Sequence, residues 1–146
     1  MRVALEAARS ATVSGDIPVG AAVFNSRGEI VSIGRNEREL LKDPTAHAEI
    51  VAIRRAAEKL GDWRLTDHTL VVTLEPCAMC AGAIAQSRLQ TVVFGAWDER
   101  AGAVGSVWDL LRDPRSTFRT EVRTGVMADE CGALIKSFIQ EVRKKD

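Results

Sequence analysis

Residues 69–80 read TLVVTLEPCAMC and join a strand pattern to the start of a helix. The first six are apolar or β-branched, as in a buried strand. Pro76 is expected to open a helix that runs to about Ser87, with Cys77 and Cys80 in its first turn. A second strand follows at 91–94, so strands and helices alternate from this stretch onward.

The residues before this stretch predict two helices and a hairpin between them, at 2–13, 43–61 and 21–33 respectively. Both helices place apolar residues at helical spacing, and Ser14-Gly15 and Gly61 supply the stop signals. In the second helix Asp43 is the expected N-cap and Pro44 the first helical residue. Gly28 provides the positive φ that the hairpin turn needs.

The residues after it predict a short helix, a strand and a final amphipathic helix, near 104–111, 120–124 and 134–142. Five strands that alternate with helices indicate the α/β class, with a mixed five-stranded sheet in three α/β/α layers. At 146 residues, 46% of them hydrophobic, the chain has the usual size of one domain. We therefore expect a single domain over residues 1–146.

Composition and charge exclude several classes of protein. The first 15 residues lack the apolar core of a secretory signal, and no apolar run approaches membrane-spanning length. Three cysteines, two of them in one Cys-x-x-Cys, do not make a disulfide framework, so we expect a cytoplasmic protein. Basic and acidic residues number 20 each, so a nucleic-acid site would have to be a local basic patch.

Cys77 and Cys80 are candidate metal ligands. At positions i and i+3 of one helical turn both sulfur atoms point the same way, and the helix dipole favours their thiolates. His47 also falls in the first turn of an expected helix and is the candidate third ligand. Because Glu49 is only two residues further on, both side chains can approach one ion only if it lies over the helix end. We therefore expect two helix N-termini to converge on one zinc ion.

Three protein ligands would leave the fourth tetrahedral position of zinc for water, whose pKa then falls to about 7. Glu49 is placed to take the proton of that water and to return protons to a substrate and to a leaving amine. A hydrolytic deaminase needs this combination. The pattern predicts one zinc ion held by His47, Cys77 and Cys80, with Glu49 as the catalytic residue.

Two other interpretations of the cysteine pair stay open. A Cys-x-x-Cys that follows a strand and opens a helix also matches a thioredoxin-like redox pair. A closed structural zinc site would take a fourth ligand from His68 or Cys131, and Glu49 would then have no task. His68 is otherwise typical of a surface loop, and Cys131 of a buried small apolar residue.

The two motifs, His47-Ala48-Glu49 and Pro76-Cys77-Ala78-Met79-Cys80, resemble the signature of the cytidine deaminase superfamily. Segments over nearly the whole chain resemble the bacterial tRNA-specific adenosine deaminases: 17–21, Asn36, 43–49, 73–77, 79–83, 93–96 and 128–131. The resemblance implies a cytidine deaminase-like fold and a homodimer with one zinc ion per subunit. It also implies conversion of adenosine to inosine at the wobble position of a tRNA anticodon.

The resemblance further implies roles for residues around the metal. Asn36 would hydrogen-bond the purine, and Ile17, Pro18 and Val19 would form an apolar wall. Ala48 and Pro76 would line the pocket beside the ligands, and Asp98 would meet the substrate backbone. The implied partner is the anticodon stem-loop of a tRNA, an arginine tRNA, whose target base is flipped into the pocket.

The chain departs from this family at two tryptophans. Trp97 stands where a basic residue is usual, and Trp108 where a smaller apolar residue is common. Candidate contacts to the tRNA backbone are basic residues of the C-terminal third: Arg112, Arg115, Arg119, Arg123 and 143–145.

Two other functions stay open. One is a deaminase of a free base or nucleoside, such as guanine or cytosine, with the same zinc core. The other is a noncatalytic zinc module that binds RNA.

Overall fold

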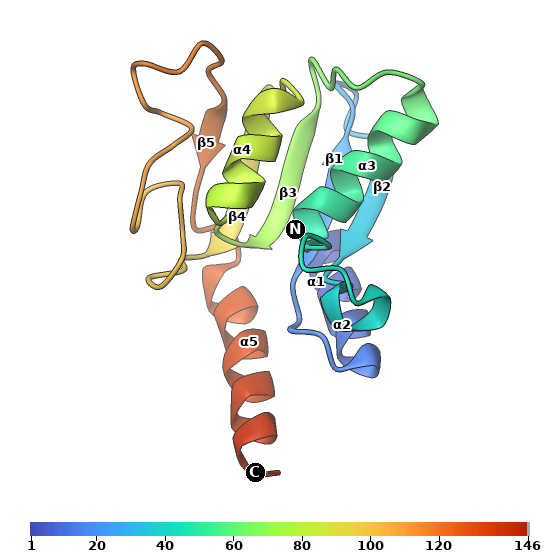
Figure 1. Ribbon diagram of the computed structural model, residues 1–146, viewed down its shortest axis with the longest axis vertical. Helices are drawn as coiled ribbons and strands as arrows, with labels where there is room; N and C mark the ends of the chain where they lie inside the picture. Colours follow the sequence, from blue (N-terminus) through green and yellow to red (C-terminus); the bar gives the residue numbers. More distant parts are fainter. Residues whose placement is uncertain (146) are drawn as a thin grey trace.

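The computed structural model describes residues 1–145, and a five-stranded sheet lies at its centre between helices (Figure 1). The strands are β1 (Gly20–Phe24), β2 (Ile30–Arg35), β3 (Thr69–Leu74), β4 (Thr91–Ala96) and β5 (Glu121–Arg123). The helices are α1 (Arg2–Ala11), α2 (Arg38–Leu41), α3 (Ala48–Leu60), α4 (Ala78–Gln86) and α5 (Ala128–Arg143), and a 3-10 turn covers Thr12–Ser14. The expected α/β class and mixed five-stranded sheet are confirmed.

The strand order, β2-β1-β3-β4-β5, brings distant segments to one edge of the sheet. β3, β4 and β5 run parallel, so the carboxyl ends of β3 and β4 lie together. β1 is antiparallel to both of its neighbours, so its first residue and the last residue of β2 lie at this same edge. The segments next to residues 20, 35, 74 and 96 therefore meet there.

Two apolar clusters hold the helices onto the sheet. The larger joins α3 and α4, through small residues such as Ala52 and Ala81, to sheet residues such as Val72 and Phe94. The smaller joins α1 and α5 to β4 through Leu5, Ala96 and Cys131. Figure 1 shows α3 and α4 in front of the sheet and α1 behind it, which gives the three expected layers.

The helix expected near residues 104–111 is wrong. This segment is a loop in which Val104 pairs with Asp109 in an isolated bridge. The backbone N–H groups of Val104 and Ser106 donate to the carboxylate of Glu75, at 3.0 and 3.1 Å, instead of to carbonyls one helical turn earlier. A contact with a residue about 30 positions away thus overrides the local helical pattern.

α5 continues beyond the sheet (Figure 1), and part of its apolar face is exposed. Cys131 in its first turn is buried, whereas Ile139 and Val142 near its end are 37% and 43% exposed. The expected apolar face is thus present, but only its N-terminal part is buried within one chain. Over residues 1–145 no helix is both long and apolar enough to cross a membrane.

Replacing Gly34 with alanine is expected to destabilise the protein by about 3 kcal/mol. A Cβ at Gly34 in β2 would overlap the backbone of α3 at Ala48 and Ala52, and backbone atoms cannot rotate away. Gly132→Ala is the matched control, because the nearest atom to its new Cβ is that of Ala96 at 3.9 Å. The control is expected to be neutral or slightly stabilising. Urea unfolding measures both, and equal stabilities would contradict the close packing of α3 on β2.

Candidate active site

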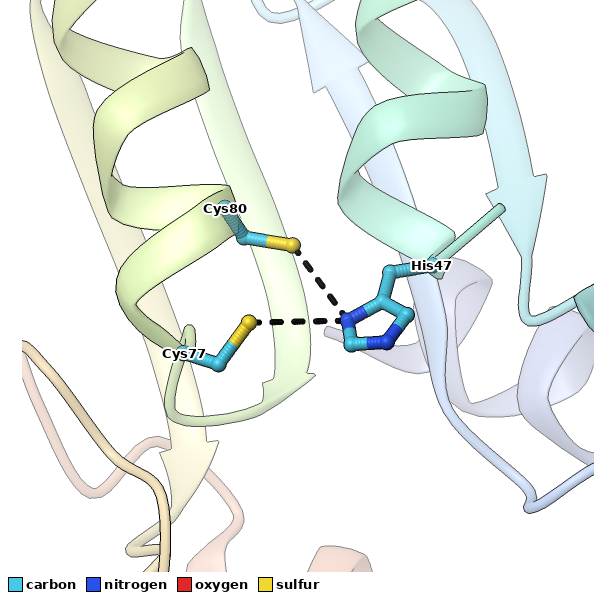
Figure 2. A group of neighbouring side chains, drawn as sticks. All are labelled: His47, Cys77 and Cys80. Carbon is cyan, nitrogen blue, oxygen red and sulfur yellow. Dashed lines mark hydrogen bonds between the residues drawn. The ribbon is translucent and has the colours of Figure 1, made fainter. Parts of the chain in front are cut away.

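His47 stands at the start of α3 but outside the helix. The helix begins at Ala48, and His47 is its N-cap with extended backbone angles, φ −67° and ψ 155°. The expected start at Asp43 and Pro44 is wrong because Asp43 makes a local turn. One of its carboxylate oxygens accepts the N–H and the hydroxyl of Thr45, at 2.8 and 2.7 Å. His47 therefore points past the end of α3 and not along its side (Figure 2).

The cysteine pair occupies the matching position on α4. Cys77 is the extended N-cap of this helix, and Cys80 lies in its first turn. The two sulfur atoms lie 3.6 and 3.5 Å from Nδ1 of His47 (Figure 2). All three candidate ligand atoms lie within 4.8 Å of one another. Two helix N-termini thus converge on one point, as the spacing of His47 and Glu49 led us to expect.

These separations fit a tetrahedral zinc ion. Zinc binds cysteine sulfur at about 2.3 Å and histidine nitrogen at about 2.0 Å, so tetrahedral angles place a sulfur and a nitrogen ligand about 3.5 Å apart. The observed sulfur–nitrogen separations are 3.6 and 3.5 Å. Within residues 1–145 this is the one group of three or more histidine, cysteine or acidic side chains that can hold a metal ion.

Neither His68 nor Cys131 can close this site as a fourth ligand. His68 comes directly before β3, at the end of the strand away from Cys77, and its Nδ1 is 2.7 Å from the carbonyl oxygen of Thr66. Cys131 is buried against Leu5 on the opposite face of the sheet. A closed structural zinc site that includes either residue is therefore wrong.

The three candidate ligands are electrostatically coupled. A hydrogen bond with Cys80 lowers the pKa of Cys77 well below that of a free thiol, and its contact with His47 lowers it further. The bond with Cys77 raises the pKa of buried Cys80, and the bond with Cys77 also raises the pKa of His47. Cys77 is therefore the thiolate of the pair, and a cation at this point would favour loss of the Cys80 proton as well.

Glu49 lies in the first turn of α3 and is only 4% exposed. Burial raises the pKa of Glu49 to about 7. A nearby dication would lower this pKa again. A carboxyl group whose pKa is raised by burial and lowered by a nearby dication can accept a proton and return it, which is what a general acid–base residue does.

A cavity of about 320 Å³ opens in front of these groups, at the small end of the range for ligand pockets. Eight predicted site residues line it: Ile17, Val19, Asn36, His47, Ala48, Glu49, Cys77 and Asp98. Pro18 and Pro76 are buried without lining it, so their part in the wall stays a prediction. The other lining residues were not singled out from the sequence: Arg38, Leu74, Glu75, Arg100 and Ala101.

Two of the predicted substrate contacts are held in place by the protein itself. The side-chain N–H of Asn36 donates to the carbonyl of Ile17 at 3.3 Å. One carboxylate oxygen of Asp98 accepts the backbone N–H groups of Arg100 and Ala101, at 3.0 and 3.3 Å. Within residues 1–145 the other oxygen of Asp98 accepts no hydrogen bond. Both side chains therefore have a fixed orientation and keep polar atoms for a ligand.

Glu75 is the most buried charged residue of the cavity wall, at 2% exposure, and it was not among the site residues expected from the sequence. Its carboxylate accepts the backbone N–H groups of Asp98 and Val104, at 3.1 and 3.0 Å, and both the N–H and the hydroxyl of Ser106. A Cβ at Gly102 would overlap this carboxylate. Glu75 thus ties the loop of residues 98–106 to the turn that carries Cys77, and the adjacent Glu-Pro-Cys was its only local signal.

Comparison with known proteins agrees with this geometry. A family model described as the cytidine and deoxycytidylate deaminase zinc-binding region matches residues 1–96. The tRNA-specific adenosine deaminase of Bacillus subtilis (strain 168) is 44% identical over 145 residues, which are 99% of this chain and 89% of that protein. The chain belongs to the tRNA-specific adenosine deaminase family.

Two kinds of deaminase are found among the solved structures that resemble this chain. The chain superposes with a TM-score of 0.88 on a structure from a study of A-to-I editing by tRNA:A34 deaminases at the wobble position of transfer RNA. The two are 39% identical, and the match covers 92% of this chain and 96% of that one. A guanine deaminase from Nitrosomonas europaea gives a TM-score of 0.76 at 28% identity, over 92% of this chain and 80% of its own.

After removal of metal with a chelator, iodoacetamide at pH 6 is expected to alkylate Cys77 about tenfold or more faster than Cys131. The lowered pKa of half-buried Cys77 makes it a thiolate at this pH, whereas burial raises the pKa of Cys131. Peptide mass spectrometry over time measures both rates, with circular dichroism to check the fold. Zinc-loaded protein is the control, in which Cys77 is expected to be protected. Equal rates with and without the chelator would contradict the assignment of Cys77 to the metal.

Proposed function

We propose that this protein hydrolyses adenosine to inosine at the wobble position of a tRNA anticodon, with one zinc ion held by His47, Cys77 and Cys80. The observation that carries this proposal is the placement of three zinc-type ligand atoms and a buried carboxyl group, Glu49, at one cavity of about 320 Å³. Membership of the tRNA-specific adenosine deaminase family supports the choice of substrate.

The ligand set defines the chemistry that is available. When bound, zinc supplies a Lewis acid that makes water a nucleophile at neutral pH. Glu49 takes one proton from the attacking water and passes it to the purine ring nitrogen next to the reacting carbon. It then takes the second proton and gives it to the departing amine. Water and adenosine are converted to inosine and ammonia, and Glu49 ends in its starting state.

The cavity walls orient the base for this reaction. Ile17 and Val19 provide apolar surface on one side, and Ala48 leaves space beside the ligands. Asn36, held by the carbonyl of Ile17, offers amide groups to the edge of a purine. Asp98 offers its free carboxylate oxygen to a ribose hydroxyl. Such a site accepts one base at a time, so the nucleotide must leave the stack of the anticodon loop.

The partners implied by the resemblance remain part of this proposal. Large apolar side chains are exposed on α4 and on the loop after β4: Met79, Trp97, Val107, Trp108 and Leu110. Exposed apolar surface beside a substrate site supports a homodimer that covers it. An arginine tRNA as the substrate and the cytoplasm as the compartment are likewise proposed, the latter supported by the three free cysteines.

Glu49→Gln is expected to give a folded, zinc-loaded protein whose rate of inosine formation is about 10² to 10⁴ times lower. The amide cannot carry the protons, although it keeps the size of the carboxyl group. Glu58→Gln, on the exposed side of the same helix, is the matched control and is expected to retain activity. Zinc content is measured in parallel. Full activity of Glu49→Gln would contradict the role of Glu49, whereas a zinc-loaded wild type that forms no inosine would favour a noncatalytic zinc module.

The substrate class is tested by comparing inosine formation in an anticodon stem-loop with ammonia release from free adenosine, guanine and cytosine. We expect turnover of the stem-loop and little or none of the free compounds, because the loop supplies contacts that a free base lacks. Turnover of a free base alone would contradict the tRNA substrate and favour the guanine or cytosine alternative. Such a result would leave the assigned zinc ligands and the proposed role of Glu49 unchanged.

A further inference from the structure

Two arginines line the cavity without an acidic partner. Arg38 comes from α2 and Arg100 from the loop after β4, and both side chains are exposed. Within residues 1–145 neither guanidinium forms an ion pair, although Glu39 and Glu99 are their neighbours in sequence. Glu39 is instead 3.1 Å from the ammonium of Lys42. Two positive charges are thus free at the mouth of a pocket for a polyanionic substrate.

Three of the arginines suggested from the C-terminal third of the sequence differ in this respect, and a fourth, Arg119, lies beside Thr66 and Gln90, away from the cavity. Arg112 pairs with Asp109 at 2.9 Å, Arg115 with Asp113 at 2.7 Å, and Arg123 with Glu121 at 2.9 Å. A phosphate would have to compete with these carboxylates for the guanidinium groups. Arg38 and Arg100 can bind a phosphate without first breaking an ion pair with a carboxylate, which makes them better placed to bind phosphate.

The backbone under Arg38 is fixed by two buried polar residues. Asp16, 1% exposed, accepts the N–H groups of Glu39 and Leu40 at the start of α2, at 2.7 and 3.2 Å. The side-chain oxygen of Asn36 accepts the N–H of Arg38 at 3.4 Å. The arginine is therefore tied to the same Asn36 that faces the base, while its side chain stays free.

The backbone under Arg100 is fixed in a similar way. Its N–H donates to the carboxylate of Asp98 at 3.0 Å, and the N–H of Asp98 donates in turn to Glu75 at 3.1 Å. Glu75 lies two residues before the candidate ligand Cys77. Both arginines thus have a defined position relative to the metal site, which reduces the entropy lost when they bind.

The two arginines reach the cavity from opposite sides. Arg38 follows β2, Arg100 follows β4, and β1 and β3 lie between these strands, so the strand ends are about 14 Å apart. Figure 1 shows α2 and the loop after β4 on different sides of the converging starts of α3 and α4. A nucleotide whose base enters the cavity therefore has one arginine on each side of its backbone.

We infer that Arg38 and Arg100 bind the two phosphodiester groups that flank the target nucleotide, one on its 5′ side and one on its 3′ side. Guanidinium groups bind phosphate oxygens through paired hydrogen bonds, so each arginine gives orientation as well as charge. This inference rests on the proposed RNA substrate. It adds what selects a nucleotide within a chain, since a free base or nucleoside has no phosphate to bind.

The first test measures deamination of the anticodon stem-loop by Arg38→Ala, Arg100→Ala and the double variant. Each single change is expected to raise KM about tenfold with little change in kcat, because the phosphates do not react. Each is also expected to reduce the slope of log KM against log salt concentration by about 0.7. Lys59→Ala, which removes one charge at the far end of α3, is the control and is expected to match the wild type.

The second test replaces the phosphate on either side of the target adenosine with a neutral methylphosphonate. Each replacement is expected to raise the KM of the wild type about tenfold but to have no further effect on the variant that has lost the matching arginine. Full penalties from both replacements in both variants, or arginine variants equal to Lys59→Ala, would overturn the inference.

Binding of the same RNA, measured by fluorescence anisotropy, repeats these comparisons without turnover. If both arginine substitutions weaken RNA binding but the wild type forms no inosine, the proposed function is overturned and the phosphate contacts stand. If inosine forms at the same rate without either arginine, the phosphate contacts are overturned and the proposed function stands.

Discussion

The convergence of two helix N-termini on one point is the constraint on which the rest of this structure depends. His47 and Cys77 can meet because each is an N-cap with an extended backbone, so neither side chain is carried along the wall of its helix. The starts of α3 and α4 are brought together by β1 and β3. The absence of a side chain at Gly34 lets the backbone of α3 lie close to the sheet. Helix N-termini also favour the thiolate form of cysteine, so the same geometry assembles the ligands and prepares their charge.

Buried carboxylates perform a second task that is common to both sides of the cavity. Asp16 and Glu75 are almost fully buried; Asp16 accepts backbone N–H groups at the start of the short helix α2, and Glu75 accepts those of an irregular loop. Such charge-assisted bonds are stronger than neutral ones and hold an irregular backbone in one conformation. The cavity walls are therefore rigid although they are not built from long helices or strands, which favours a preorganised site.

The metal site and the cavity walls make separate contributions to function. Likeness to both a tRNA:A34 deaminase and a guanine deaminase indicates that one fold accompanies different substrates. In the proposed function the ligands and Glu49 carry the reaction at an amidine carbon, whereas the proposed contacts of Asn36, Asp98, Arg38 and Arg100 select the molecule that presents it. Selection between a nucleotide in RNA and a free base then depends on groups that lie outside the reacting atoms.

Local patterns in the sequence determined the five strands, the mixed sheet and the ligand set, because the period of apolar residues and the spacing within His-x-Glu and Cys-x-x-Cys act over a few residues. Only the tertiary structure decided the true start of α3, the short helix α2 and the loop in place of a helix at 104–111. It also revealed the contacts of Glu75 and the positions of Arg38 and Arg100 at the cavity. Apart from the start of α3, which the local turn at Asp43 sets, these features depend on hydrogen bonds and strand order that join residues more than 20 positions apart. The free energy of such contacts exceeds the small local preferences that a sequence pattern records.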